Sequence, residues 1–261
     1  MSIKTFINWK LYFLLLAGNV FSTIAILPYV TSLEADVIKA SPLPLPIVLL
    51  LSVVQSTVLF AVLLFIGLRL AKSTGFKVSI LENYLAKKKI EVNVKQIVKT
   101  SIPLGVLAGV AIVGLDLIFI KSGLNLGGQV SIPIWQGFLA SFYGGISEEI
   151  LLRLFFMTFI VWLIGKLIRT KSIPTENNII IWSSIIIAAI IFGLGHLPAT
   201  AAITTLTPLV IFRAILLNGI GGVVFGWLYW KRGFESAMIA HFSADIVIHV
   251  IFPIALSMLA L

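Results

Sequence analysis

Hydrophobic residues fall into long runs along this chain, separated by short polar segments. Several of these runs exceed the ~18 apolar residues that mark a membrane-spanning helix. We predict helices, with ends uncertain by several residues, over 9–30, 45–70, 101–121, 132–168, 178–197, 205–230 and 236–260. The fold class indicated is all-α, a polytopic transmembrane helical bundle.

One of these runs is too long for a simple span. At ~1.5 Å rise per residue, a helix over 132–168 would be more than about 50 Å long, whereas the hydrocarbon core is ~30 Å thick. The pair Gly144-Gly145 is the natural place for this helix to bend or divide. An eighth helix or a surface-lying segment would follow from a division, so we predict seven or eight spans.

Two polar segments interrupt the first half of the chain. Residues 31–44 are predicted to be a loop, because proline denies a helix its N–H donor and three prolines cluster here; they are Pro42, Pro44 and Pro46. Residues 71–100 form the one polar region of any size. Its lysines outnumber its acidic residues; they are Lys72, Lys77, Lys87, Lys88, Lys89, Lys95 and Lys99, against Glu82 and Glu91.

The distribution of basic residues predicts the orientation. Positive-inside counting places 71–100 in the cytoplasm, and alternation then places two further clusters on the same side, together with the N-terminus. These clusters are Lys166, Arg169 and Lys171, and the pair Lys231-Arg232. We therefore expect a multi-pass protein of the cell membrane with a cytoplasmic N-terminus.

Composition supports the membrane assignment and excludes several functions. Of the 261 residues 59% are apolar and 11% are charged, whereas soluble domains carry about 25% charged residues. The absence of cysteine excludes disulfides, thiolate metal sites and a cysteine nucleophile. The net charge of +9 does not indicate nucleic-acid binding, since most basic residues lie between apolar runs, where they meet lipid headgroups.

The chain is predicted to be one continuous membrane domain, since no internal repeat is visible. Its first run is too long for a cleaved signal peptide, and Pro28-Tyr29 is not a cleavage site, so this run is expected to be a retained helix. Residues 1–100 would form N-terminal helices and a basic loop, and residues 101–261 the helical core.

Polar residues inside the apolar runs are the main candidates for function. They are Asp116, Glu148, Glu149, Arg153, His196, Arg213, His241, Asp245 and His249. A charged residue at the centre of a span costs about 2.5–3.5 kcal/mol. Such residues persist when they are paired, face a cavity or do chemistry, so we predict an intramembrane polar cavity.

The first group is Glu148-Glu149-Ile-Leu-Leu-Arg153. On a helix, Arg153 lies about 40° around the axis from Glu149, which favours a salt bridge, and about 140° from Glu148. We therefore predict that Arg153 holds Glu149 and leaves Glu148 free to project elsewhere. The alternative is a buried ion-pair network that only holds helices together.

The histidines form two further groups. Phe192-Gly-Leu-Gly-His196 ends an apolar helix, and a lone histidine there is often an interhelical hydrogen bonder. His241, Asp245 and His249 share one helical face, where a carboxylate can orient an imidazole, although a packed polar ladder is the alternative. Imidazole and carboxylate are also good zinc ligands, but the chain has no His-Glu-x-x-His signature.

Together these patterns resemble the CPBP family, which comprises type II CAAX prenyl endopeptidases, bacteriocin-processing enzymes and Abi proteins. The resemblance covers about 134–250. Three family motifs are matched in order, Glu-Glu-x-x-x-Arg by Glu148, Glu149 and Arg153, Phe-x-x-x-His by Phe192 and His196, and His-x-x-x-Asn/Asp by His241 and Asp245. The stretch Gly222–Gly233 also resembles the family's approach to its last motif.

The match has three departures. Leu152 and Leu154 stand where many members have phenylalanine and glycine. Asp245 stands where the prenyl endopeptidases typically have asparagine, and an ionised aspartate cannot donate a hydrogen bond to an oxyanion. Asp245 must therefore be protonated, act on His241 or help to bind a cation. His249 belongs to no motif, and we expect a structural role for it.

The resemblance implies an intramembrane endopeptidase. Glu148, assisted by His196, would activate a water molecule, His241 with Asp245 would stabilise the oxyanion, and Glu149 and Arg153 would hold the first helix. No cofactor is expected, or else zinc bound by His196, His241 and a carboxylate. The partners implied are the bilayer and a peptide or protein substrate, such as a prenylated C-terminus, a leader peptide or a signalling peptide; the oligomeric state is not readable.

Two other functions compete with proteolysis. A non-catalytic scaffold would keep the fold and act by binding partners. A proton-coupled transporter also uses buried Glu, Asp and His residues, but it would be expected to carry inverted repeats, and none is visible in this sequence.

Overall fold

The computed structural model describes residues 7–124, 131–170 and 172–259. None of these residues lies in a β-strand. Within them, seven stretches are helical, long and apolar enough to cross a membrane: Trp9–Leu33, Leu45–Thr74, Val94–Lys121, Ile134–Leu167, Asn178–Ile203, Pro208–Arg232 and Phe234–Leu259. The predicted all-α transmembrane bundle is confirmed, and the protein is a multi-pass membrane protein.

Four of the spans are single helices and three are composite. The single helices are α1 (Trp9–Leu33), α3 (Leu45–Thr74), α5 (Val94–Lys121) and α10 (Pro208–Arg232). The first composite span consists of α6 (Ile134–Phe142), the π-helical η1 (Tyr143–Glu148) and η2 (Ile150–Met157), and α7 (Thr158–Leu167). The second consists of α8 (Asn178–Gly195) and α9 (Leu197–Ile203). The third consists of α11 (Phe234–Ile246), the π-helical η4 (Val247–Ile251) and α12 (Phe252–Leu259). Short elements α2 (Ala35–Lys39), α4 (Ser79–Leu85) and η3 (Pro174–Glu176) lie outside the spans.

Two details of the predicted helices need correction. The long run 132–168 does not divide, so the eighth helix is not formed; the chain continues through Gly144-Gly145 in π-helical turns, a form frequent at functional sites. The loop predicted at 31–44 is also shorter, because α1 continues to Leu33 and α2 follows it. Pro46 lies in the first turn of α3, where backbone N–H groups have no acceptor within the helix, so the N–H that proline lacks is not needed.

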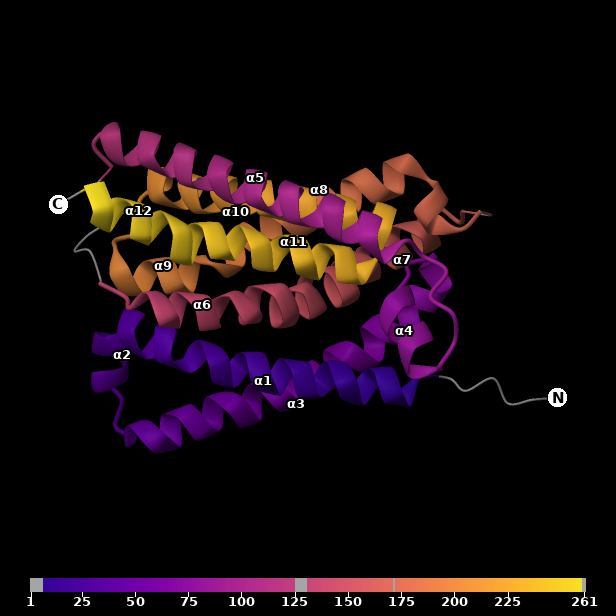
Figure 1. The fold of residues 1–261 in the computed structure, drawn as a ribbon, viewed down its shortest axis with the longest axis horizontal. Helices are drawn as coiled ribbons and strands as arrows, with labels where there is room; N and C mark the ends of the chain where they lie inside the picture. Colours follow the sequence, from indigo (N-terminus) through magenta and orange to yellow (C-terminus); the bar gives the residue numbers. More distant parts are fainter. Residues whose placement is uncertain (1–6, 125–130, 171, 260–261) are drawn as a thin grey trace.

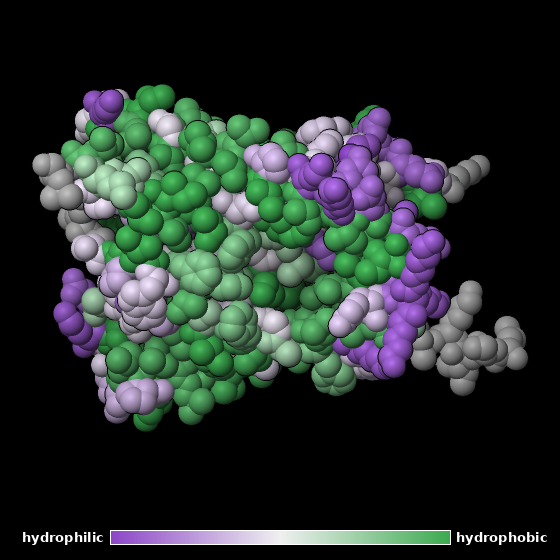
Figure 2. Space-filling model, in the orientation of Figure 1, coloured by the Kyte–Doolittle hydropathy of each residue, from purple (hydrophilic) through white to green (hydrophobic). Residues whose placement is uncertain are grey.

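The spans run along the long axis of the molecule (Figure 1). At one end α4 lies beside the start of α1, and the backbone of Phe234 donates to Lys77 at 3.0 Å. Hydrophilic side chains gather at this end, while apolar side chains cover most of the remaining visible surface (Figure 2). We call it the basic end, defined by Lys72, Lys77, Lys88, Lys231 and Arg232. Lys171, predicted to belong to the second basic cluster, lies outside the described residues.

Small residues bring together the helices that carry the polar groups. A side chain at Gly105 or Gly109 of α5 would collide with Ala240 or Ala244 of α11. In the same way, Gly222 of α10 packs directly against α8. Such close backbone approach is how membrane helices associate, since lipid offers no hydrophobic driving force between them. It places α5, α8, α10 and α11 around a common interior.

Candidate functional site

A cavity of about 680 Å³ lies inside the bundle. It is lined by residues from the first, second and third spans as well as from the C-terminal helices. Its ionisable lining residues include Asp116, Glu148, His196, Arg213, His241 and Asp245. The predicted intramembrane polar cavity is therefore present, and it collects residues that lie far apart in the sequence.

Glu148 faces both motif histidines. One carboxylate oxygen, Oε1, lies 3.9 Å from Nε2 of His196, and the other, Oε2, lies 3.5 Å from Nε2 of His241. The Glu148 side chain is 22% exposed and that of His196 is 34% exposed, whereas His241 is buried. The three groups thus face one another closely enough for one water molecule beside them to contact the carboxylate and an imidazole together.

Glu149 is turned away from the cavity and fully buried. It forms an ion pair with Arg153, Oε1 to Nη1, at 3.2 Å, which confirms the pairing predicted from their spacing. The same Oε1 accepts a hydrogen bond from Nδ1 of His241 at 2.7 Å, a contact that the sequence did not predict. Adjacent glutamates therefore have different surroundings, since one lines the cavity and the other holds an arginine and an imidazole.

Hydrogen bonds orient both imidazoles in the same way. Nδ1 of His196 lies 2.9 Å from the carbonyl oxygen of Phe192, and a carbonyl can only accept, so Nδ1 carries the proton. Nδ1 of His241 likewise donates to Glu149. Each ring is held through Nδ1 and directs Nε2 towards Glu148, an arrangement that sets the tautomer of a catalytic or ligating histidine.

Two phenylalanines frame the histidines. Phe192 contacts His196 edge to face with ring centroids 4.7 Å apart, and Phe225 stacks on His241 at 4.5 Å. The Arg153 guanidinium lies 5.2 Å from the Phe192 ring centre and 5.4 Å from that of Phe225. Phe192 belongs to a predicted motif, but the role of Phe225 was missed. Its signal was its place in the glycine-rich stretch before the last motif.

Asp245 and His249 extend the polar face of the last span. Oδ1 of Asp245 lies 3.8 Å from Nε2 of His241, and both Asp245 and His249 line the cavity, as their shared helical face predicts. Nδ1 of His249 lies 3.5 Å from the hydroxyl of Tyr29 in α1, and the rings meet edge to face. His249 therefore contacts the first span, in keeping with the structural role expected for it.

A buried polar network holds the π-helical turn before Glu148. Ser147 donates to the side-chain oxygen of Asn19 at 2.8 Å, and the hydroxyls of Ser22 and Ser147 are hydrogen-bonded at 2.6 Å. All three side chains are fully buried. Since Ser147 directly precedes Glu148, this network ties the helix that carries the carboxylate to α1. The sequence offered no signal for it, because serine is common in membrane helices.

Asp116 and Arg213 were both singled out as intramembrane charges, and the structure pairs them. Nε and Nη2 of Arg213 each lie 2.6 Å from Oδ1 of Asp116. The pair joins α5 to α10 and lines the cavity. It accounts for two charges that belong to none of the motifs.

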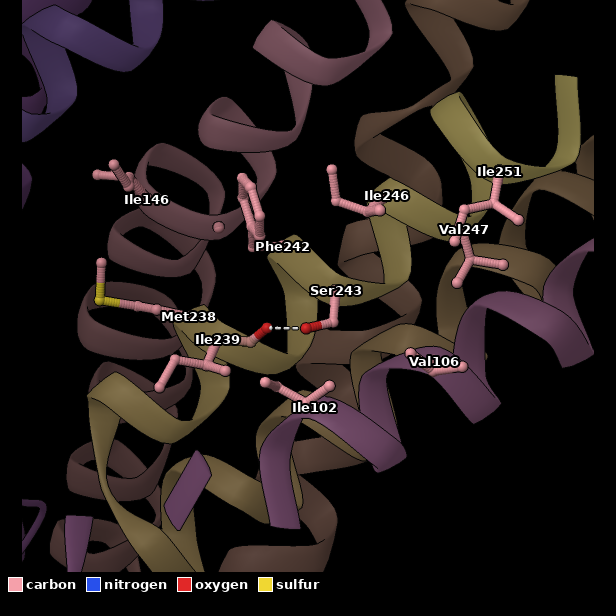
Figure 3. A pocket seen from close by; sticks show the side chains of 11 residues that line it. Ile102, Val106, Ile146, Met238, Ile239, Phe242, Ser243, Ile246, Val247 and Ile251 are labelled. Atoms are coloured by element: carbon pink, nitrogen blue, oxygen red, sulfur yellow. Dashed lines mark hydrogen bonds between the residues drawn. The ribbon is translucent and has the colours of Figure 1, made fainter. Parts of the chain in front are cut away.

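A second hollow, of about 440 Å³, lies between α5, η1 and α11 (Figure 3). Its described lining has no ionisable side chain, and the hydroxyl of Ser243 is hydrogen-bonded to the Ile239 carbonyl at 2.7 Å. This apolar hollow therefore offers no group for acid–base chemistry. Of these two hollows, the polar cavity is the candidate site.

Gly144 is a further site residue that the motifs did not identify. A Cβ atom here would collide with the Asp245 carboxylate and would come within 3.0 Å of Nε2 of His241. We expect Gly144→Ala to lower hydrolytic activity by at least about 10-fold, since displacing reacting groups by ~1 Å can cost 10²-fold. The control is Gly114→Ala, since nothing lies within 4 Å of a Cβ added there. Equal activity of the two purified variants would contradict this placement.

The described residues contain no group of three or more His, Asp or Glu side chains that could hold a metal ion. The predicted ligands His196 and His241 do approach Glu148, and each uses Nδ1 in a protein hydrogen bond. Such a hydrogen bond is usual for zinc-ligating histidines and leaves Nε2 free, so His196 and His241 are the residues that would hold the predicted zinc. No step of the proposed mechanism passes through a metal.

The fold and the cavity define a multi-pass membrane protein with a glutamate–histidine site inside its helical bundle. A family model described as type II CAAX prenyl endopeptidase Rce1-like matches residues 130–247, which contain all three motifs. This match covers a little under half of the chain and supports the resemblance to the CPBP family of membrane proteases that the motifs indicate. No curated protein and no solved structure gives a significant match.

Proposed function

We propose that this protein is an intramembrane endopeptidase that hydrolyses a peptide bond of a membrane-associated substrate with water activated by Glu148. The observation that carries the proposal is the approach of the Glu148 carboxylate to Nε2 of His196 and of His241, at 3.9 and 3.5 Å, within a cavity inside the bundle. A general base must reach the proton that it takes directly or through one water molecule, and these short distances support a water molecule held by Glu148 and a histidine together.

The first step is attack by water. Glu148 and the neutral Nε2 of His196 both accept hydrogen bonds, so a water molecule between them would be held by its two protons with a lone pair free. Its oxygen forms a bond to the scissile carbonyl carbon while Glu148 takes a proton. The result is a tetrahedral intermediate with a negative oxygen.

His241 is placed to stabilise that oxygen. Because its Nδ1 already donates to Glu149, it must be doubly protonated to donate from Nε2 as well. Three carboxylates lie around the ring, those of Glu148, Glu149 and Asp245. We propose that Asp245 acts on His241, which is one of the roles open to it in place of asparagine.

Collapse of the intermediate completes the reaction. The carbonyl re-forms, the C–N bond breaks, and the protonated Glu148 gives its proton to the departing amine. The products are a carboxylic acid and an amine, which become a carboxylate and an ammonium ion once the acid's proton passes to the amine, and Glu148 returns to its ionised state. Glu149 and Arg153 are positioning residues in this scheme, because Glu149 contacts His241, Arg153 contacts Glu149, and neither lines the cavity.

The direct test is a comparison of small membrane-associated peptides by mass spectrometry, in cells that carry the wild type or Glu148→Ala. We expect at least one peptide to shift from its cleaved to its uncleaved form in the variant. Identical peptide profiles together with an unchanged cellular phenotype would favour a non-catalytic scaffold and overturn the proposal.

His196 and His249 both line the cavity, but their replacement by alanine should have very different effects on activity. His196→Ala removes a group that faces the water-binding position, so we expect at least about a 10²-fold loss of activity. His249→Ala removes only a contact with Tyr29 and should change activity by less than about 3-fold. Rates measured on the two purified variants check this contrast, and comparable losses in both would contradict the assignment.

Metal removal should leave the enzyme active. The scheme uses only carboxylate and imidazole groups, so we expect dialysis of the purified protein against a strong zinc chelator to retain more than about half of the activity. Loss of activity that zinc alone restores would show that a metal is required, and His196 would then be a zinc ligand instead of an acceptor for the attacking water.

A further inference from the structure

The catalytic cavity extends towards one end of the bundle only. Its lining includes residues at the ends of three helices that meet there. These are Leu33 and Glu34 at the end of α1, Ile203 at the end of α9 and Arg213 near the start of α10. The chain passes through the basic end between Glu148 and Phe192, and again between Phe225 and His241. None of the described residues in these two stretches lines the cavity. The mouth of the cavity is therefore at the end opposite to the basic end.

The two ends carry very different charge. The basic end holds Lys72, Lys77, Lys88, Lys231 and Arg232, with further lysines between α4 and α5. Around the mouth there are fewer basic residues, Lys39 after α1 and Lys121 at the end of α5, and Lys39 pairs with Asp36 at 3.7 Å. Membrane proteins orient by the excess of Lys and Arg in cytoplasmic loops, and acidic residues contribute little. This asymmetry assigns the basic end to the cytoplasm.

We infer that the active site opens to the non-cytoplasmic face, so that its substrates are peptide segments presented on the outer side of the membrane and not cytoplasmic C-termini. That the cavity binds a substrate rests on the proposed function. The face to which the cavity opens rests on the distribution of charge and on the geometry of the cavity. It selects, among membrane-associated peptides, those that have been translocated or inserted across the bilayer.

The depth of the site narrows the substrate further. Glu148 lies about 20 Å along its span from Ile134 at the mouth end, at ~1.5 Å per residue. An extended peptide advances ~3.3 Å per residue, so about six unfolded residues must enter before a peptide bond reaches the carboxylate. A folded domain cannot supply them within a cavity of about 680 Å³. The substrate segment is therefore a flexible terminus or a juxtamembrane stretch.

The absence of cysteine makes the direction directly testable, because each introduced thiol is the only one in the chain. Two exposed lysines form a matched pair, Lys39→Cys at the mouth end and Lys88→Cys at the basic end, and Ala199→Cys places a thiol in the cavity lining. Intact cells that express each variant are treated with a membrane-impermeant maleimide. Labelling in detergent measures the total thiol and controls for expression and folding.

We expect the Lys39→Cys and Ala199→Cys variants to be labelled from outside, and the Lys88→Cys variant only after the cells are permeabilised. Labelling of Lys88→Cys in intact cells, with Lys39→Cys protected, would overturn the inference. The result is independent of catalysis. If labelling is as expected but Glu148→Ala changes no peptide, the proposed function fails while the direction of the cavity stands.

A second arm assigns the substrate side. Purified protein is reconstituted into sealed vesicles, and the orientation is measured with the same thiol variants. A flexible peptide cleaved by the detergent-solubilised enzyme is then added outside. The rate of cleavage should be proportional to the fraction of molecules whose cavity mouth faces outward. A rate proportional to the fraction whose mouth faces the vesicle interior would overturn the inference.

Discussion

Replacing Glu148 with glutamine is expected to reduce peptide-bond hydrolysis by at least about 10²-fold, because the amide cannot take a proton from water. The two side chains have nearly the same shape, so the packing of η1 and the buried network at Ser147 should persist. The measurement is the turnover rate of the purified protein in detergent or vesicles, together with its melting temperature. A large loss of rate with an unchanged melting temperature is the expected pair of results.

The matched control is Glu176→Gln. Glu176 lies in η3, is exposed and does not line the cavity, so its loss should leave the rate within about 2-fold of the wild type. Full activity of the Glu148→Gln protein would remove the general base from the scheme. In that case the glutamate would be a structural member of a polar cluster, as the ion-pair alternative holds.

The largest effect on stability is expected at Arg153. This side chain is 2% exposed, pairs with Glu149 at 3.2 Å and donates to the Gly222 carbonyl at 3.3 Å. Arg153→Met would leave the buried Glu149 with only His241 as a partner, and removing one member of a buried ion pair typically costs about 3–5 kcal/mol. The melting temperature in detergent should fall clearly.

A double variant separates the contribution of the Glu149–Arg153 ion pair to stability from the contribution of side-chain packing. In Glu149→Gln/Arg153→Met no unpaired charge is left at this site, and such replacements of both partners are often neutral or stabilising. We therefore expect the double variant to melt at a higher temperature than Arg153→Met alone, although the loss of the Glu149 contact to His241 should keep its activity low. A double variant less stable than both single variants would show that the two side chains stabilise the fold mainly by their packing.

The local parts of the site were predictable, because helix geometry fixes which side chains are neighbours three or four residues apart. The pairing of Glu149 with Arg153 and the shared face of His241, Asp245 and His249 follow from this rule. The split between Glu148 and Glu149 follows from it as well. The order of the three motifs also predicts which residues share the candidate site.

The distant contacts were not predictable from any local rule. Glu149 meets His241 across 92 positions of the chain, and Ser147 meets Asn19 across 128. Hydropathy shows that a segment lies in the membrane, but in runs that are apolar on all sides it does not show which helix faces which. Small residues such as Gly105 settle that choice, since they permit a close approach whose partner becomes visible only when the helices are packed.

The sequence by itself determined the approximate limits of the spans, since a run of apolar residues must satisfy its backbone hydrogen bonds internally and so must be helical in lipid. It left their number at seven or eight, and it predicts the orientation that we infer, because basic residues are counted loop by loop. Only the tertiary structure decided that the polar groups share one cavity and that this cavity opens away from the basic end, because both depend on how deep each helix sits against its neighbours.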